Sequence, residues 1–363
     1  MIWPGFALGH RRMLPLPRKT ANFEKGVMVL YEFMQKARAL FQCAAALCLA
    51  VILCGEARAG AAEVTGRMLV PVGHTVGIKL FSKGILVVKI PEGGSPARSC
   101  GLKTGDVILE CGGVAVTSTE QFQSLLQKTP EEQTELEVSR NGKSVTLQVE
   151  PEANEKGVYC IGAWVRDSMA GIGTMTYYDP KTGEFGALGH GITDVDTALL
   201  MPFSNGSILP STVKAVRRGE AGSAGELRGD FDLTETLGDL FANTACGIFG
   251  VMESGEYAEG TALPVGAAKV GKAVIRSNVE GDETKEYAIE ILKVVEDSPD
   301  SRDLVLSVTD PELIAKTGGI VQGMSGSPIL QNGKIVGAVT HVLVNDPTRG
   351  YGIFIENMLD AAG

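Results

Sequence analysis

Short segments that alternate between apolar and polar residues dominate the sequence, and few stretches keep a helical period over three turns. Residues 134–140 and 144–150 alternate in this way and are joined by Asn141-Gly142, a dipeptide that favours a two-residue hairpin turn. Beyond residue 157, many strand-like pieces are separated by turn signals. The pattern predicts a mainly β chain built from barrels or sandwiches, and 363 residues are enough for two domains.

The N-terminal segment predicts an export signal or membrane anchor helix over residues 1–59. Residues 1–38 hold seven Lys or Arg against two Glu, residues 39–54 are nearly all apolar, and an Ala57-Arg58-Ala59 cleavage pattern follows. A segment of 16 residues is short for a membrane span of about 20, so retention of the anchor stays open, and a buried core helix is the alternative. Three methionines are candidates for the true start: Met1, Met28 and Met34.

Net charge and motif content exclude several function classes. The chain carries −10 overall, whereas nucleic-acid-binding proteins present a dense basic face. The four cysteines after the export segment form no C-x-x-C pair, which leaves buried thiols, with a disulfide between Cys100 and Cys111 as the alternative. No H-E-x-x-H zinc motif and no phosphate-binding loop occur. We therefore expect no metal, no cofactor and no nucleic-acid partner.

Residues 66–150 predict a small α+β domain. Residues 95–109 have the pattern S-P-A-x-x-x-G-L-x-x-G-D-x-I-L, and residues 120–127 read as a short helix. This order resembles a PDZ domain of the bacterial protease-associated type. The resemblance implies that Gly77-Ile78-Lys79-Leu80 is the loop whose backbone N–H groups bind the end of a peptide segment, which then adds as a strand. A structural spacer that binds nothing is the alternative.

The second domain, residues 157–363, contains a candidate nucleophile loop, Gly323-Met324-Ser325-Gly326-Ser327-Pro328. A serine hydroxyl attacks only if a base takes its proton and N–H donors stabilise the oxyanion that forms. Glycines around Ser325 allow a tight bend that points the Gly323 and Ser325 amides into one oxyanion hole. A strand, an Asn332-Gly333 turn and a second strand follow, as in chymotrypsin-like proteases; a glycine-rich turn without chemistry is the alternative.

Two histidines remain as candidates for the general base. His190 lies in a small-residue loop 135 residues before Ser325, an order that fits a base from a first barrel facing a serine from a second. His341 lies on the strand after the serine loop and reads as a supporting residue. The residues alone leave the acid open among four aspartates: Asp194, Asp196, Asp310 and Asp346.

The second domain resembles the stage IV sporulation protein B peptidase family of endospore-forming bacteria. Matching motifs are F-G-A-L-G-H-G-I-T-D at 185–194, T-D-P-E-L at 309–313, T-G-G-I-V-Q-G-M-S-G-S-P-I at 317–329 and G-A-V-T-H-V-L-V-N-D-P-T-R-G-Y-G at 337–352. The resemblance implies a chymotrypsin-like double β-barrel and a serine endopeptidase with a triad of His190, Asp310 and Ser325.

The family also implies a role in sporulation signalling. Its members are exported to the forespore membrane or the intermembrane space, process themselves, and cleave a membrane-bound regulator. That cleavage activates an intramembrane metalloprotease and then a late sigma factor. The alternative is an exported PDZ adaptor whose barrel is inactive, and the complete triad favours the enzyme.

Overall fold

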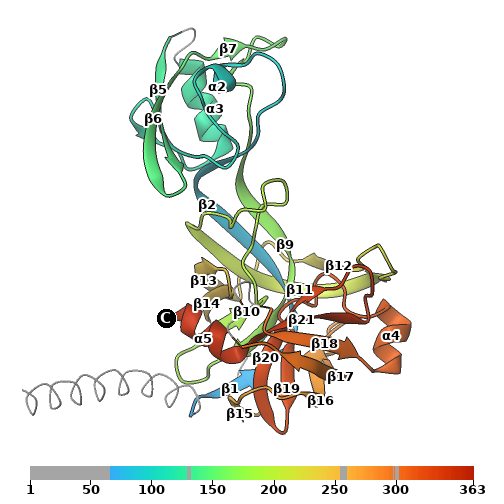
Figure 1. Ribbon diagram of the computed structural model, residues 1–363. Coiled ribbons are helices and arrows are strands. Elements are labelled where there is room, and N and C mark those ends of the chain that lie inside the picture. The colour runs from blue at the N-terminus through green and yellow to red at the C-terminus, as the bar shows by residue number, and fades with distance from the viewer. Residues whose placement is uncertain (1–65, 129–131, 254–259, 297, 299–301) are drawn as a thin grey trace, which may run out of the picture. The chain divides into compact units, whose positions relative to one another are not determined.

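The computed structural model describes residues 66–128, 132–253, 260–296, 298 and 302–363 (Figure 1). The described part is mainly β, as the alternating pattern predicts. The predicted export helix over 1–59 lies outside these residues. Within the described ranges, no helix is long and apolar enough to cross a membrane.

A first barrel forms because antiparallel pairings lead from β2 through neighbouring strands and back to β2. Its strands are β2 (Thr75–Lys89), β9 (Trp164–Tyr178), β10 (Glu184–Ala187), β14 (Gly247–Met252), β13 (Gly238–Thr244) and β11 (Asn205–Arg217). Beside them lie β1 (Met68–Pro71), β15 (Leu263–Pro264) and β12 (Glu226–Phe231). Apolar side chains that alternate along these strands, such as Val76 and Ile78, fill the barrel interior.

A second closed barrel follows in the chain. It consists of β16 (Gly271–Ser277), β17 (Lys285–Val294), β18 (Leu304–Val308), β21 (Arg349–Phe354), β20 (Lys334–Val342) and β19 (Pro328–Gln331). Helices α4 (Pro311–Thr317) and α5 (Ile355–Ala362) flank it. The predicted Asn332-Gly333 turn joins β19 to β20, and both residues have the positive φ (52° and 72°) that a two-residue hairpin requires.

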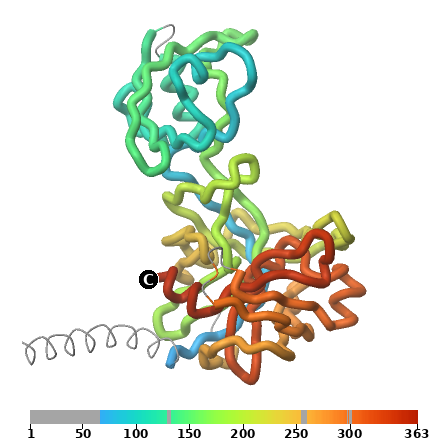
Figure 2. Tube along the Cα trace, in the orientation of Figure 1, coloured from blue at the N-terminus to red at the C-terminus, as the bar shows by residue number. Residues whose placement is uncertain are grey.

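The PDZ-like part is an insertion into the first barrel. Strands β2 and β9 pair side by side and both extend out of that barrel into the insertion (Figures 1 and 2). Between them lie α2 (Pro96–Ser99), β3 (Val107–Cys111), β4 (Val114–Ala115), α3 (Thr119–Lys128), β5 (Thr134–Arg140), β6 (Lys143–Val149), β7 (Glu152–Ala153) and β8 (Tyr159–Cys160). The predicted hairpin at Asn141-Gly142 is confirmed by the pairing of β5 with β6. The insertion has its own apolar core, and Cys100 and Cys111 are both free thiols.

The expected peptide-binding loop at Gly77-Ile78-Lys79-Leu80 is wrong. These four residues lie in the barrel half of β2, paired with β9 on one side and with β11 on the other. Both strand edges are therefore occupied, and no N–H group is left to bind a peptide end. The boundary at residue 66 is wrong for the same reason, because the chain before about residue 84 belongs to the first barrel. The alternation of β-branched residues along β2 is the same in its barrel half and in its insertion half. The sequence pattern therefore could not show where β2 passes from the barrel into the insertion.

Candidate active site

The Ser325 loop lies between the two barrels and is fixed from both sides. In the second barrel, the Gly326 N–H donates to Val339 O at 2.7 Å. From the first barrel, the Thr174 N–H donates to Ser325 O at 3.0 Å, and Thr174 Oγ1 donates to Gly323 O at 2.7 Å. Gly326 has φ +97°, and a Cβ there would meet Thr174 O at 2.0 Å. The motif therefore needs glycine at this position because the two barrels approach each other closely there.

The amides predicted to form the oxyanion hole are available. In the described part of the chain, neither the Gly323 N–H nor the Ser325 N–H donates to a protein acceptor. Both residues line the same cavity. Gly323 has φ +98°, a conformation that glycine adopts without strain. Two unpaired N–H groups beside a serine hydroxyl are what an oxyanion hole requires.

His190 comes from the first barrel, on the loop after β10. Leu188 and Gly189 both have positive φ (70° and 68°), so the chain turns sharply just before the histidine. Asn243, a buried residue of β13, then anchors the loop. Its amide accepts from Ile192 N and donates to the carbonyls of Ile192 and Met201. Sequence reasoning missed Asn243, because nothing in its local sequence marks a side chain that bridges two distant points of a loop.

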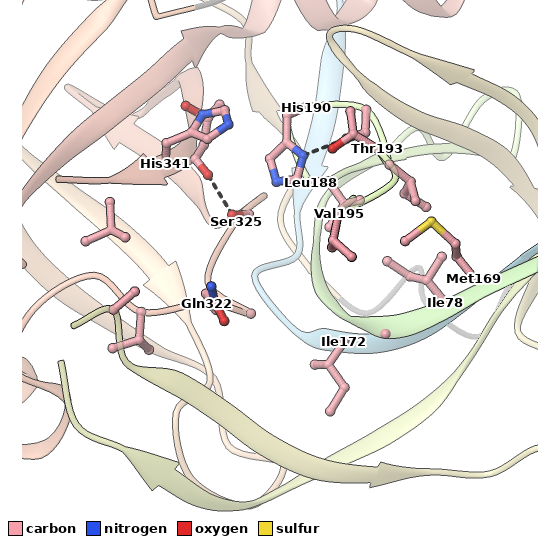
Figure 3. A pocket seen from close by; sticks show the side chains of 18 of the residues that line it. Ile78, Met169, Ile172, Leu188, His190, Thr193, Val195, Gln322, Ser325 and His341 are labelled. Carbon is pink, nitrogen blue, oxygen red and sulfur yellow. Dashed lines mark hydrogen bonds between the residues drawn. The ribbon is translucent and has the colours of Figure 1, made fainter. Parts of the chain in front are cut away.

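His190 and Ser325 line one end of the cavity together with His341 (Figure 3). The His190 Nδ1 lies 2.9 Å from Gly191 O, its hydrogen-bond partner, so Nδ1 carries the proton and Nε2 is the acceptor in the neutral ring. Burial lowers the pKa of His190 below the ordinary histidine value, although the bond to Gly191 acts in the opposite direction. A neutral ring whose Nε2 accepts from no described residue suits a general base.

The hydroxyl of Ser325 is directed away from His190. Its Oγ donates to Thr340 O at 2.6 Å. Thr340 and His341 lie near the end of β20, and the rings of His341 and His190 are 5.0 Å apart between centroids, tilted by 36°. The β19–β20 hairpin brings Thr340 next to the serine loop, but a register shift between Ile329 and Leu330 means that counting from the Asn332-Gly333 turn does not give the pairing at this end. The Ser325 hydroxyl must release Thr340 O before it can donate to His190.

Asp310, the acid that the family resemblance implies, is not placed beside His190. Its Oδ1 accepts from the backbone N–H groups of Glu312 and Leu313, as the N-cap of α4, and its Oδ2 accepts from Ala288 N. It does not line the cavity. A short polar residue before a proline is also what a helix start requires, so the T-D-P-E-L motif has a structural explanation.

The other three candidate acids also have partners of their own. Asp194 and Asp196 are ion-paired to Arg166 of β9, and Asp194 also accepts from Thr197. Asp346 accepts from the Thr348 N–H and hydroxyl. Asp194 shapes the loop that carries His190, because its Oδ1 accepts from the backbone N–H groups of Asp196 and Thr197 and from the Thr197 hydroxyl. The group that contacts Nδ1 of His190 is therefore the Gly191 carbonyl, not one of these carboxylates.

A second, smaller cavity of about 240 Å³ lies in the PDZ-like insertion. Its walls are α3, through Phe122 and Leu126, and the segment 160–165 that leads into β9. Trp164 is 63% exposed there. Trp164 pairs with Lys89 of β2 along one edge of β9. None of the described strands pairs with the opposite edge of β9 at this point, which faces α3. A strand edge beside a helix is the geometry by which an extended peptide can add to a sheet.

Comparison with known proteins agrees with this architecture. The family model of the SpoIVB peptidase S55 matches residues 157–359, and a PDZ domain model matches residues 87–140. The second match begins inside β2, after the crossing out of the first barrel. Both families are the ones that the sequence motifs resemble.

Three further similarities cover only parts of the chain. A protein of Lactococcus lactis named as a zinc metalloprotease is 33% identical over 108 residues, which is 30% of this chain and 24% of that protein. The PDZ domain of an SdrC-like protein from Listeria monocytogenes is 21% identical, with a TM-score of 0.21, over 23% of this chain and 87% of that one. A protease from M. tuberculosis in its active form is 13% identical, with a TM-score of 0.30, over 53% and 73%. The chain spans less than a quarter of the length of the curated relatives it matches.

Proposed function

Because the chain belongs to the SpoIVB peptidase S55 family of serine peptidases, we propose that Ser325 is its nucleophile and His190 its general base. The observation that carries the proposal is the convergence at one end of a cavity of a serine, a neutral histidine and two unpaired amides. The family match supports a peptidase of sporulation, and the barrel interface supplies the geometry for endopeptidase chemistry.

The chemical steps follow from these groups. Ser325 Oγ leaves Thr340 O, gives its proton to His190 Nε2, and attacks the scissile carbonyl carbon. The Gly323 and Ser325 N–H groups stabilise the oxyanion. His190 then returns the proton to the leaving amine, and water releases the acyl group by the same route. The Gly191 carbonyl accepts the hydrogen bond from the Nδ1–H of His190 throughout. It thereby orients the ring, which is the role of an aspartate in the familiar triad.

A fluorophosphonate probe tests this assignment. Wild-type protein should be labelled at Ser325, and both Ser325→Ala and His190→Ala should lose labelling and proteolysis by several powers of ten, since the two residues act as a unit. Ser327→Ala is the matched control, because Ser327 is a buried serine of the same loop. Labelling that persists in Ser325→Ala would place the nucleophile elsewhere.

We further propose that the enzyme is exported, is anchored in the forespore membrane and then releases itself. The basic and apolar sequence of residues 1–59 and the family membership support this proposal. N-terminal sequencing of wild type and Ser325→Ala tests it, and cuts near residues 57–75 should be lost in the variant. Identical N-termini in the two proteins would assign all trimming to the host.

The proposed substrate is a membrane-bound regulator whose cleavage activates an intramembrane metalloprotease and, through it, a late sigma factor. The family membership supports this role, and the groove between α3 and Trp164 would hold a peptide segment of the regulator or of the enzyme itself. Co-reconstitution of enzyme and regulator in vesicles tests it. The regulator should be cut by wild type and stay intact with Ser325→Ala.

A further inference from the structure

The active-site cavity has an apolar lining that extends well beyond the reacting groups. Its volume is about 830 Å³, and Ser325 and His190 occupy one end. None of the described residues that line it is Asp, Glu, Lys or Arg. Figure 3 shows Ile172 across the cavity from the two histidines, with Val195 between them. Such a cavity can take a substrate side chain of considerable size but offers no partner for a charge.

The wall residues come from both barrels, and three large apolar ones among them are exposed to water in the free protein. Val195 and Leu200 of the His190 loop are 80% and 42% exposed, and Val344 of the second barrel is 46% exposed. These exposed apolar side chains gather at a site where a peptide must bind for the proposed reaction. Covering them with an apolar substrate group removes their surface from water, which favours binding.

A charged substrate side chain would be disfavoured in the same place. It would lose its hydration, and the polar side chains of the lining, such as Gln322 and Thr193, are neutral. The charges near the loop are already paired with each other, because Arg166 binds Asp194 and Asp196. The body of the protein is acidic, so the absence of charge from this lining is a local property of the cavity.

We propose that the enzyme selects substrates with large apolar residues, such as Leu, Ile, Met or Phe, next to the scissile bond and rejects charged residues there. This inference rests on the proposed function. The test is a peptide library that varies one position beside the scissile bond, with cleavage sites read by mass spectrometry. Replacing a large apolar residue by Ala should lower kcat/KM by at least about tenfold, and Lys or Asp should lower it further.

A variant with a new charge in the wall gives the sharper test. Ile172→Asp places a carboxylate in the cavity and should create a preference for Lys and Arg over Leu, while the uncharged control Ile172→Asn should create none. Probe labelling of Ser325 in every variant confirms a folded and reactive site. Cleavage without apolar preference, or no gain for basic residues in Ile172→Asp, overturns this inference but leaves the proposed function intact. Absence of both labelling and cleavage in wild type overturns the proposed function and the inference with it.

Discussion

Replacement of Arg166 by glutamine is the most informative single perturbation outside the reacting groups. The Arg166 side chain is 30% exposed and binds Asp194, whose carboxylate is 0% exposed, and also Asp196. Removing one partner of a buried ion pair costs about 3–5 kcal/mol. Asp194 keeps its hydrogen bonds from Asp196 N, Thr197 N and Thr197 Oγ1, so we expect a smaller loss of about 2 kcal/mol in the free energy of unfolding.

The same substitution should also impair catalysis, because Asp194 lies in the loop that carries His190. We expect kcat/KM for a peptide substrate to fall by more than about tenfold when that loop loses its anchor. The matched control is Arg140→Gln in the PDZ-like insertion. Arg140 makes a bidentate pair with the buried Asp106, at 2.7 and 2.6 Å, and has no hydrogen bond to the His190 loop among the described residues. The Arg140→Gln variant should lose a similar free energy of unfolding but keep the kcat/KM of wild type.

Urea unfolding and peptide kinetics, both at a temperature where each variant is folded, separate the two effects. Burial alone would raise the pKa of Asp194, but the Thr197 hydrogen bonds and the Arg166 charge hold that pKa below its ordinary value. The stabilisation is therefore complete above the pKa of the unfolded chain and is lost as pH falls through the lower folded value. Acid unfolding of Arg166→Gln should begin at higher pH than in wild type. Equal kinetic losses in the two variants would refute the reasoning.

Three further predictions follow from the same contacts. The lowered pKa of His190 should place the acid limb of kcat/KM below about pH 6.5, and a limb above that value would point to another base. Asp310→Asn should keep nearly full activity, because asparagine caps a helix as well as aspartate does, and a loss of 100-fold or more would show that the charge reaches His190. Trp164→Ala should weaken peptide binding measured by calorimetry yet preserve Ser325 labelling, and unchanged binding would move the peptide site elsewhere.

Local sequence chemistry was sufficient for several elements, and it selected His190 and Ser325, which line the same cavity. Asn141-Gly142 and Asn332-Gly333 predicted two hairpins because both residues of each turn need positive φ. The glycines around Ser325 predicted a tight loop, and the distance in sequence to His190 suggested a partner from another barrel. The turns and the serine loop depend on interactions within a few residues. The choice of His190 was narrow because the sequence has only four histidines.

Other features depended on pairings that a single sequence does not display. The stretch Gly77–Leu80 fits a PDZ loop and a barrel strand equally well, since the two differ only in which strands lie beside it. Gly77 itself shows the tertiary reason, because a Cβ there would meet Phe231 Cβ at 2.5 Å. Asp310 likewise has a helix-capping explanation that its motif could not separate from a catalytic one. For Gly77–Leu80 the deciding neighbours, β9 and β11, are distant in sequence, whereas the groups that Asp310 caps lie only two and three residues away and do not exclude either role.

The point at which the PDZ-like insertion leaves the first barrel has a consequence for the active site. Strands β2 and β9 are already paired when they leave the barrel, so the insertion closes a loop whose ends are adjacent and leaves the barrel pairings intact. The segment of β9 that borders the α3 groove, the Arg166 that binds the His190 loop, and Ile172 in the cavity wall then follow one another along a single strand. Peptide bound beside Trp164 would therefore contact the same strand that anchors the loop of the general base. Arg166→Gln should remove the ion pairs that join β9 to the loop of His190, whereas Arg140→Gln should leave them in place.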